Sequence, residues 1–101
     1  YSIDVDPEVI EGGTVGLGQK LKAAGVFCAP RYIQKPAFQC EVIRDQRTFG
    51  NSRFPFNLAS PEALDYSPER FPGTFEALSR VLVLPWSENY LIHHVEYIAE
   101  T

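Results

Sequence analysis

The chain has 101 residues, of which 45% are apolar and 22% are charged, and its formal net charge is −4. This length suits one domain, and this composition is typical of a globular chain and not of a disordered one. An acidic chain lacks the basic surface that nucleic acid requires, and no apolar stretch approaches the about 20 residues that span a bilayer. We therefore expect neither nucleic acid nor a membrane as a partner.

The N-terminal part predicts a strand followed by a helix. Residues 1–6 alternate apolar and polar side chains, a pattern typical of a half-buried strand. Residues 14–24 carry apolar side chains at i, i+4 and i+7, which indicates an amphipathic helix. Thr14 is the expected N-cap, and Gly25 is the expected residue just beyond the C-terminus of this helix.

The middle of the chain predicts a second strand and then a long irregular segment. Residues 26–33 are strand-like, and Pro30 within them argues for an edge position in a sheet or for a bulge. A short helical or irregular segment is expected to reach about Ile43. Residues 44–67 show no sustained period, although they contain several aromatic side chains and prolines. A loop of this length in a compact domain is uncommon and is often functional, so we interpret it as a variable insert.

The C-terminal part predicts a helix, a strand and a last helix. Residues 68–79 contain the second main helix. Residues 81–84 form an unbroken apolar run that a proline ends, which is short enough for a buried strand. From Leu91 onward apolar residues recur at helical spacing, with Ser87 or Asn89 as the expected cap. This order of elements is typical of an α+β fold.

The residue types that most often carry metal or redox chemistry do not form a motif. Cys28 and Cys40 lack a metal or redox spacing, and we expect two free, mostly buried thiols. His93 and His94 are adjacent, so on a helix they point about 100° apart and cannot share a metal ion. The glycine-rich run 12–18 lacks the spacing of a phosphate loop and is interpreted as a helix start. The sequence thus predicts neither a metal site nor a catalytic residue.

Two groups of polar residues are candidate binding residues. Arg31, Tyr32 and Lys35 stand between two prolines at the end of the second predicted strand, where loops on a scaffold often carry sites. We interpret them as candidate substrate-binding residues. The second group consists of Arg44, Arg47 and Arg53, in or beside the insert. Guanidinium groups bind phosphate through a bidentate fork, so these are candidate phosphate ligands; the alternative is solvated charges around a hydrophobic plug.

The stretch LKAAGVFCAPRYIQKPAFQ, residues 21–39, resembles a segment of the pyridoxal-phosphate (PLP)-dependent aminotransferases that act on nucleotide sugars, the DegT/StrS family. In that family a helix ending in L-K-A-A-G-I precedes a strand with a His-Tyr-Pro-like end and then a Q-P-A-Y-like turn. Here residues 21–25 match the helix end, Arg31 and Tyr32 stand at the His-Tyr position, and residues 35–38 stand at the turn.

The second half of the chain is similar to the same family. Residues 71–85 contain F-P, E-A-L and V-L-V-L-P in the family's order, and a closing helix is expected after them. Arg31 replaces the usual His and Ile33 replaces the usual Pro, which indicates an unusual substrate. Leu91 stands where the family often has a Thr or Ser cap, so the last helix is expected to begin at an earlier residue.

The resemblance implies a fold, a reaction and partners. The fold would be the small domain of fold-type I PLP transferases, a three- or four-stranded, mainly antiparallel sheet with helices packed on one face. The parent enzyme would move an amino group from an amino acid, with glutamate as the expected donor, to a nucleotide-linked keto-sugar. PLP and its Schiff-base lysine would belong to an N-terminal large domain, so this chain alone is expected to be inactive. The parent would be a cytoplasmic homodimer.

The resemblance leaves open whether the chain is part of an enzyme or an independent module. The chain contains no methionine and begins on a strand-like residue, which predicts a piece cut from a larger polypeptide. The resemblance implies that this piece is a single domain, the C-terminal one. The alternative is a free-standing α+β interaction domain, because function belongs to sites and not to folds.

Overall fold

The computed structural model describes residues 1–101, which divide into two compact units. The first unit comprises Tyr1–Gln34 and Ala77–Thr101, and the second comprises Lys35–Glu76. The predicted α+β class is confirmed, because a small antiparallel sheet is combined with helices. None of the helices has the length and apolar character that crossing a bilayer requires.

The sheet of the first unit has three strands in the order β1-β3-β2, each antiparallel to its neighbour. The strands are β1 at Ser2–Asp4, β2 at Ala29–Pro30 and β3 at Val81–Val83. Of the two alternatives predicted from Pro30, an edge position or a bulge, the structure has the edge position. β2 is much shorter than the predicted residues 26–33, and it ends before Arg31, which adopts a left-handed φ of 52°. The chain therefore turns out of the strand at this point.

One face of the sheet belongs to the hydrophobic core. Ile3, Leu82 and Pro30 lie opposite one another across the three strands, and Leu82 is fully buried. Side chains alternate along a strand, so the neighbouring row points to the opposite face. This row consists of Ser2, Val83 and Ala29.

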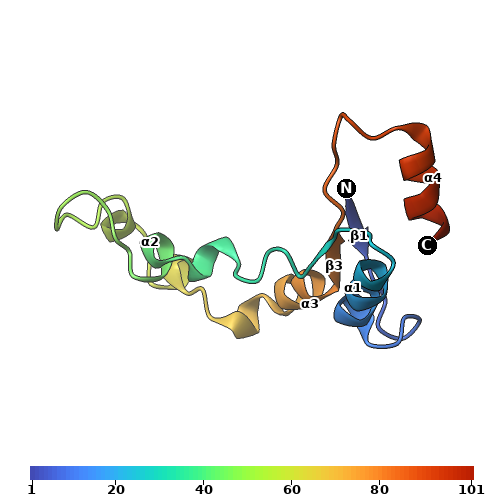
Figure 1. The fold of residues 1–101 in the computed structure, drawn as a ribbon. Coiled ribbons are helices and arrows are strands. Elements are labelled where there is room, and N and C mark those ends of the chain that lie inside the picture. The colour runs from blue at the N-terminus through green and yellow to red at the C-terminus, as the bar shows by residue number, and fades with distance from the viewer. The chain divides into compact units, whose positions relative to one another are not determined.

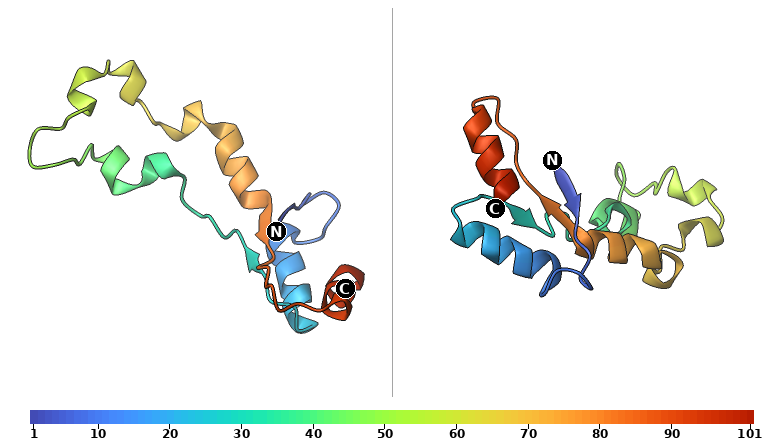
Figure 2. Two further views of the ribbon diagram at one scale, coloured as in Figure 1. Left: turned by 90° about the horizontal axis from the view of Figure 1, so that it is seen from above. Right: turned by 90° about the vertical axis from the view of Figure 1, so that its right-hand side faces the viewer.

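Helices α1 and α4 pack on the core face. They span Gly13–Ala23 and Ile92–Glu100, respectively. Figures 1 and 2 show both helices on the same side of the sheet. Leu21 of α1 and Ile98 of α4 join Leu82 in one hydrophobic cluster. The Tyr97 hydroxyl of α4 donates to the carbonyl of Ala24 at 2.8 Å. Because a fully buried aliphatic side chain contributes about 1.5–3 kcal/mol, hydrophobic contact is the main force that holds these helices on the sheet.

Glycines stand at both ends of α1. Gly12, with a left-handed φ of 77°, is the N-cap, so the predicted Thr14 cap is wrong. The buried Thr14 hydroxyl instead donates to the Ser79 carbonyl at 2.9 Å. This hydroxyl therefore does not cap the backbone amides at the start of α1. The predicted terminal glycine is confirmed: Gly25 has a φ of 80°, and its amide donates back into the last turn.

Helix α4 begins later than predicted. Its N-cap is Leu91, and not Ser87 or Asn89. Ser87 forms a separate turn, in which its side-chain oxygen accepts the Asn89 amide at 3.2 Å and its carbonyl accepts the Tyr90 amide at 3.1 Å. The Leu91 amide donates to Nδ1 of His94 at 3.1 Å. The imidazole at the third helical position thus accepts the amide of the N-cap residue, as the glutamate or glutamine of a capping box does.

The second unit is built from short helical turns and a cluster of aromatic rings. It contains α2 at Glu41–Arg44 and 3₁₀ turns at Ala37–Gln39, Phe56–Leu58, Glu62–Leu64 and Pro68–Arg70. The ring centroid of Phe38 lies 4.8 Å from that of Phe71, 6.0 Å from Phe75 and 6.2 Å from Tyr66. These contacts hold together a segment without strands. Helix α3, Pro72–Arg80, leads directly into β3.

The two cysteines are free thiols in different surroundings. Cys28 is partly buried, and its Sγ lies 3.6 Å from the carbonyl oxygen of Gly18, to which it donates. Cys40 is exposed, so the predicted burial is wrong for this residue. Its place explains the difference, because Cys40 is the N-cap of the short helix α2, in a unit that has no sheet to cover it.

Candidate functional site

The candidate substrate residues Arg31 and Tyr32 lie directly after β2. The left-handed φ of 52° at Arg31 is uncommon for a residue with a side chain, and such strain costs on the order of 1–3 kcal/mol. The Arg31 amide donates to the Val81 carbonyl at 2.9 Å, which holds this turn against β3. Both side chains are exposed and have no hydrogen-bond or ion-pair partner. The edge strand therefore ends in a free guanidinium and a free phenol.

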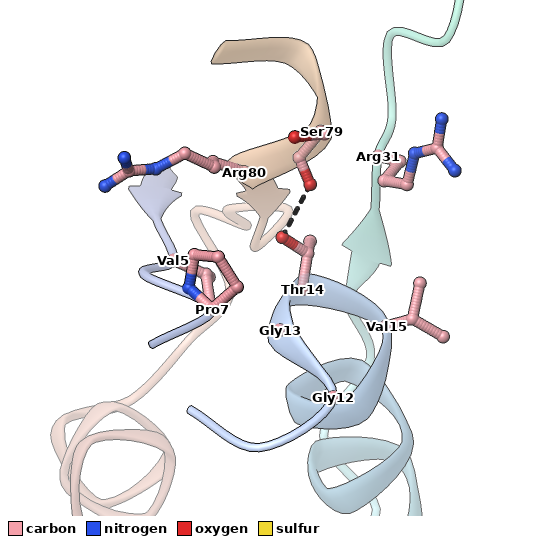
Figure 3. Close-up of a pocket in the computed structure, with 9 residues that line it drawn as sticks. All are labelled: Val5, Pro7, Gly12, Gly13, Thr14, Val15, Arg31, Ser79 and Arg80. Carbon is pink, nitrogen blue, oxygen red and sulfur yellow. Dashed lines mark hydrogen bonds between the residues drawn. The ribbon is translucent and has the colours of Figure 1, made fainter. Parts of the chain in front are cut away.

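A hollow of about 390 Å³ adjoins Arg31. Figure 3 shows the hydrogen bond from Thr14 of α1 to the Ser79 carbonyl of α3, and it shows Arg31 extending away from Thr14. Arg80, which also lines the hollow, forms a two-pronged ion pair with Asp4, at 2.8 and 3.1 Å. Because this pair balances the charge of Arg80, Arg31 is the cation that remains available to a ligand.

The residues around this hollow include types that bind anionic ligands. A guanidinium at a rim binds phosphate or carboxylate through paired, charge-assisted hydrogen bonds. No carboxylate, imidazole or thiol lines the hollow. General acid–base and nucleophilic catalysis both need such a group within reach of the reacting atoms. The chemistry of this lining is therefore compatible with recognition of an anionic group.

Lys35 belongs to the second unit, whereas the other two candidate substrate residues belong to the first. Its charge acts on Asp45. The pKa of the Asp45 carboxyl lies below its ordinary value, mainly because Arg44 donates a hydrogen bond to it, and the charges of Arg44, Arg47 and Lys35 add to this effect. Lys35 thus takes part in the charge balance around α2.

Each candidate phosphate-binding arginine already has a partner within the second unit. The pairs are Arg44–Asp45 at 2.7 Å, Arg47–Glu41 at 3.2 Å and Arg53–Gln46. The same hydrogen bond to Asp45 raises the pKa of the Arg44 guanidinium. All three arginines are exposed, so water screens their interactions. This arrangement matches solvated charges more closely than a preformed phosphate site.

Sequence reasoning missed an array of rings at the start of α4. Trp86, Tyr90 and His94 follow one another at a spacing of four residues, and consecutive ring centroids lie 5.8 and 6.1 Å apart in edge-to-face arrangements. The His93 ring lies 4.1 Å from that of His94. Tyr90 lines two hollows, of about 480 and about 470 Å³. The regular spacing of the rings was the signal available in the sequence.

The lysines of this chain do not form a site for PLP. Lys20, Lys22 and Lys35 are all exposed. A lysine that forms an imine with the cofactor is activated in an enclosed site, and the pyridinium nitrogen needs its own partner nearby. These residues therefore support no reaction step through PLP. No set of three or more His, Cys, Asp or Glu side chains is grouped closely enough to hold a metal ion.

Comparisons of the chain with protein-family models, with curated proteins and with solved structures gave no match. The candidate site is therefore defined by its geometry and chemistry. It consists of Arg31 and Tyr32 at the end of β2, beside the hollow at the start of α1.

Proposed function

We propose that the chain is the C-terminal small domain of a PLP-dependent aminotransferase of the DegT/StrS type. The parent enzyme transfers an amino group from an amino acid, with glutamate as the expected donor, to a nucleotide-linked keto-sugar. It works in the cytoplasm as a homodimer. This domain covers the cleft of a larger, cofactor-holding domain and positions the substrate. Alone it does not transaminate.

The observation that carries this proposal is the free Arg31 guanidinium at the end of an edge strand, with Tyr32 beside it. Arg31 is exposed and unpaired, although its neighbour Arg80 is engaged by Asp4. A cation left without a protein partner suits an anionic ligand such as the phosphates of a nucleotide sugar. The phenol of Tyr32 adds a donor and a ring that packs against a sugar or a base.

The sheet supports the proposal in a second way. Ala29, Val81 and Val83 are apolar or small, are only partly buried, and point away from the core face on which α1 and α4 pack. Antiparallel sheets can leave one face to solvent, but that face is then usually polar. A partly apolar open face fits a layer that packs against a larger domain of the same polypeptide.

The test begins with the coding sequence upstream of Tyr1. If the reading frame continues for about 250 residues, the size of a further large domain, the complete protein is expressed and its PLP absorbance is recorded. Transfer from glutamate to a nucleotide-linked keto-sugar is then measured. Arg31→Ala is expected to raise KM for the keto-sugar at least about tenfold, the effect of losing ~1.4 kcal/mol of binding, whereas the exposed Lys20→Ala on α1 serves as control. An unchanged KM in Arg31→Ala rejects the role of this residue.

A free-standing interaction domain is the second candidate function. It is favoured by large apolar side chains on the surface of the first unit, since Tyr1, Phe27 and Trp86 are 77%, 74% and 66% exposed. Exposed aromatic side chains are common at protein interfaces. A reading frame that begins close to Tyr1, together with a purified chain that binds no PLP, would select this alternative.

A further inference from the structure

A hollow lies beside helix α4, between this helix and the edge of the sheet. None of the residues of α4 is fully buried, and Ile98 is the one that packs against the hydrophobic cluster. Figures 1 and 2 show that the chain leaves β3, reverses direction and returns in α4. Residues at β1, in this connection and on α4 surround a hollow of about 480 Å³. Part of the apolar side of α4 therefore lines this hollow.

The side chains that line this hollow are apolar or aromatic, and none of them is charged. The aliphatic part of the lining consists of Ile3, Leu84, Pro85, Val95, Ile98 and Ala99. The aromatic part consists of Tyr1, Trp86 and Tyr90. The amino group of Tyr1 is already engaged, because it donates to the Leu84 carbonyl at 2.8 Å. A charged ligand would lose its hydration here without gaining a side chain of opposite charge, so the hollow suits a neutral ligand.

The three aromatic side chains carry the only side-chain polar atoms of the lining. These are the hydroxyls of Tyr1 and Tyr90 and the indole N–H of Trp86, and none has a hydrogen-bond partner in the chain. The rings of Trp86 and Tyr90 lie edge to face, with centroids 5.8 Å apart. A sugar would leave most of its hydroxyls unpaired against the aliphatic walls, which is costly. A flat ring system instead gains contact with aromatic side chains.

The size of the hollow selects a small molecule over a segment of another protein. Pockets for small molecules measure about 300–1,000 Å³, and this hollow of about 480 Å³ lies within that range. Two turns of an α-helix with its side chains, about 11 Å long and about 10 Å wide, occupy roughly 850 Å³. A helix from a partner protein would therefore not fit inside it.

We infer that the hollow between α4 and β1 is a binding site for a neutral, mainly apolar small molecule with a flat ring system. The ligand contacts Trp86 and Tyr90 on one side and Val95 and Ala99 of α4 on the other. This site shares no lining residue with the hollow beside Arg31, and it does not depend on the proposed transferase activity. Because the ligand adds apolar contacts to α4, it also holds this helix more firmly on the sheet.

The test uses N-phenyl-1-naphthylamine, a neutral fluorescent probe, and the full 101-residue chain at a concentration at which light scattering shows the monomer. Trp86 is the only tryptophan of the chain and lines the hollow, so its fluorescence should pass to a probe bound there. We expect saturable binding of one probe per chain. Uptake that does not saturate, or that occurs only where the chain associates, would show adsorption to exposed surface or between copies and would overturn the proposal.

Two variants place the probe in this hollow. Ala99→Phe fills it with a ring, and we expect Kd to rise at least about tenfold; circular dichroism checks that the variant stays folded, as the exposure of Ala99 leads us to expect. Glu100→Phe is the matched control, because Glu100 is exposed on the same helix and lines no hollow, so Kd should not change. In Trp86→Ala, followed by the fluorescence of the probe itself, Kd should rise about fivefold. A Kd that neither Ala99→Phe nor Trp86→Ala changes would overturn the proposal.

A second probe tests the class of ligand. 8-Anilino-1-naphthalenesulfonate has the same ring system as N-phenyl-1-naphthylamine and adds a sulfonate. Because no charged side chain lines the hollow, we expect this anion to bind at least about fivefold more weakly than the neutral probe. Equal or tighter binding of the anion would contradict the assignment of a neutral ligand.

Discussion

At the scale of single residues, Leu82 is the side chain on which the sheet depends most. It is 0% exposed and lies on the central strand, opposite Ile3. Leu82→Ala leaves a cavity among fixed neighbours, and we expect it to lower the free energy of unfolding by about 2–5 kcal/mol. Urea denaturation measures this loss. Leu58→Ala is the matched control because Leu58 is 74% exposed, and a loss as large as that of Leu82→Ala would contradict the assignment of the core.

The two thiols should differ in reactivity. Cys40 is exposed, whereas burial raises the pKa of the Cys28 thiol above its ordinary value. The thiolate is the reactive form, so at pH 8 we expect iodoacetamide to modify Cys40 first, as measured by mass spectrometry of peptides. In denaturant both rates should become similar. Faster modification of Cys28 in the folded chain would show that its environment is described wrongly.

The acid titration of Asp45 tests the pairing within the second unit. Arg44 donates a hydrogen bond to this carboxylate and holds its pKa below the usual range. In Arg44→Gln we expect the carboxyl titration of Asp45, followed by carbon NMR, to move to higher pH. Arg70→Gln is the control, since Arg70 pairs with Asp65 instead. An Asp45 titration that is the same in wild type and Arg44→Gln would mean that the pair does not persist in solution.

At the scale of elements, the contact between α1 and β2 depends on a glycine. A Cβ at Gly18 would lie 2.9 Å from Cγ of Pro30, which is too close for any side chain. Gly18→Ala should therefore lower the melting temperature, although alanine in a helix is favoured over glycine by about 1 kcal/mol. Gly73→Ala in α3 is the matched control because nothing lies within 4 Å of its Cβ position. This control should melt at the same or a higher temperature, and a similar gain in Gly18→Ala would exclude the close packing.

The elements that were predicted well have local causes. Gly25 ends α1 because only a residue without a Cβ adopts its φ of 80° at no cost, and Pro30 occupies an edge strand because it has no amide to donate. The elements that were predicted poorly depend on remote partners. Thr14 failed as a cap because its hydroxyl bonds to Ser79, 65 residues away in the chain, and no spacing rule anticipates such a partner.

At the scale of the whole molecule, the exposed apolar side chains predict self-association. Tyr1, Trp86 and Ile92 are 77%, 66% and 72% exposed in the first unit. Such surfaces are uncommon on stable monomers and favour dimers or larger assemblies. We expect the mass from light scattering to rise with concentration, with a blue shift in the fluorescence of the only tryptophan. A chain that stays strictly monomeric at high concentration would contradict this prediction.

The amino-acid sequence was sufficient for the order of elements, the α+β class, the edge strand and the glycine that ends α1, because hydrophobic period, missing amides and missing Cβ atoms act over a few residues. The free state of Arg31, the pairing of the insert arginines and the capping role of His94 required the folded chain. These features depend on which polar groups find partners after the strands and helices pack. These partners are determined by which groups lie close together in the folded chain, and the spacing of residues in the sequence does not reveal that proximity.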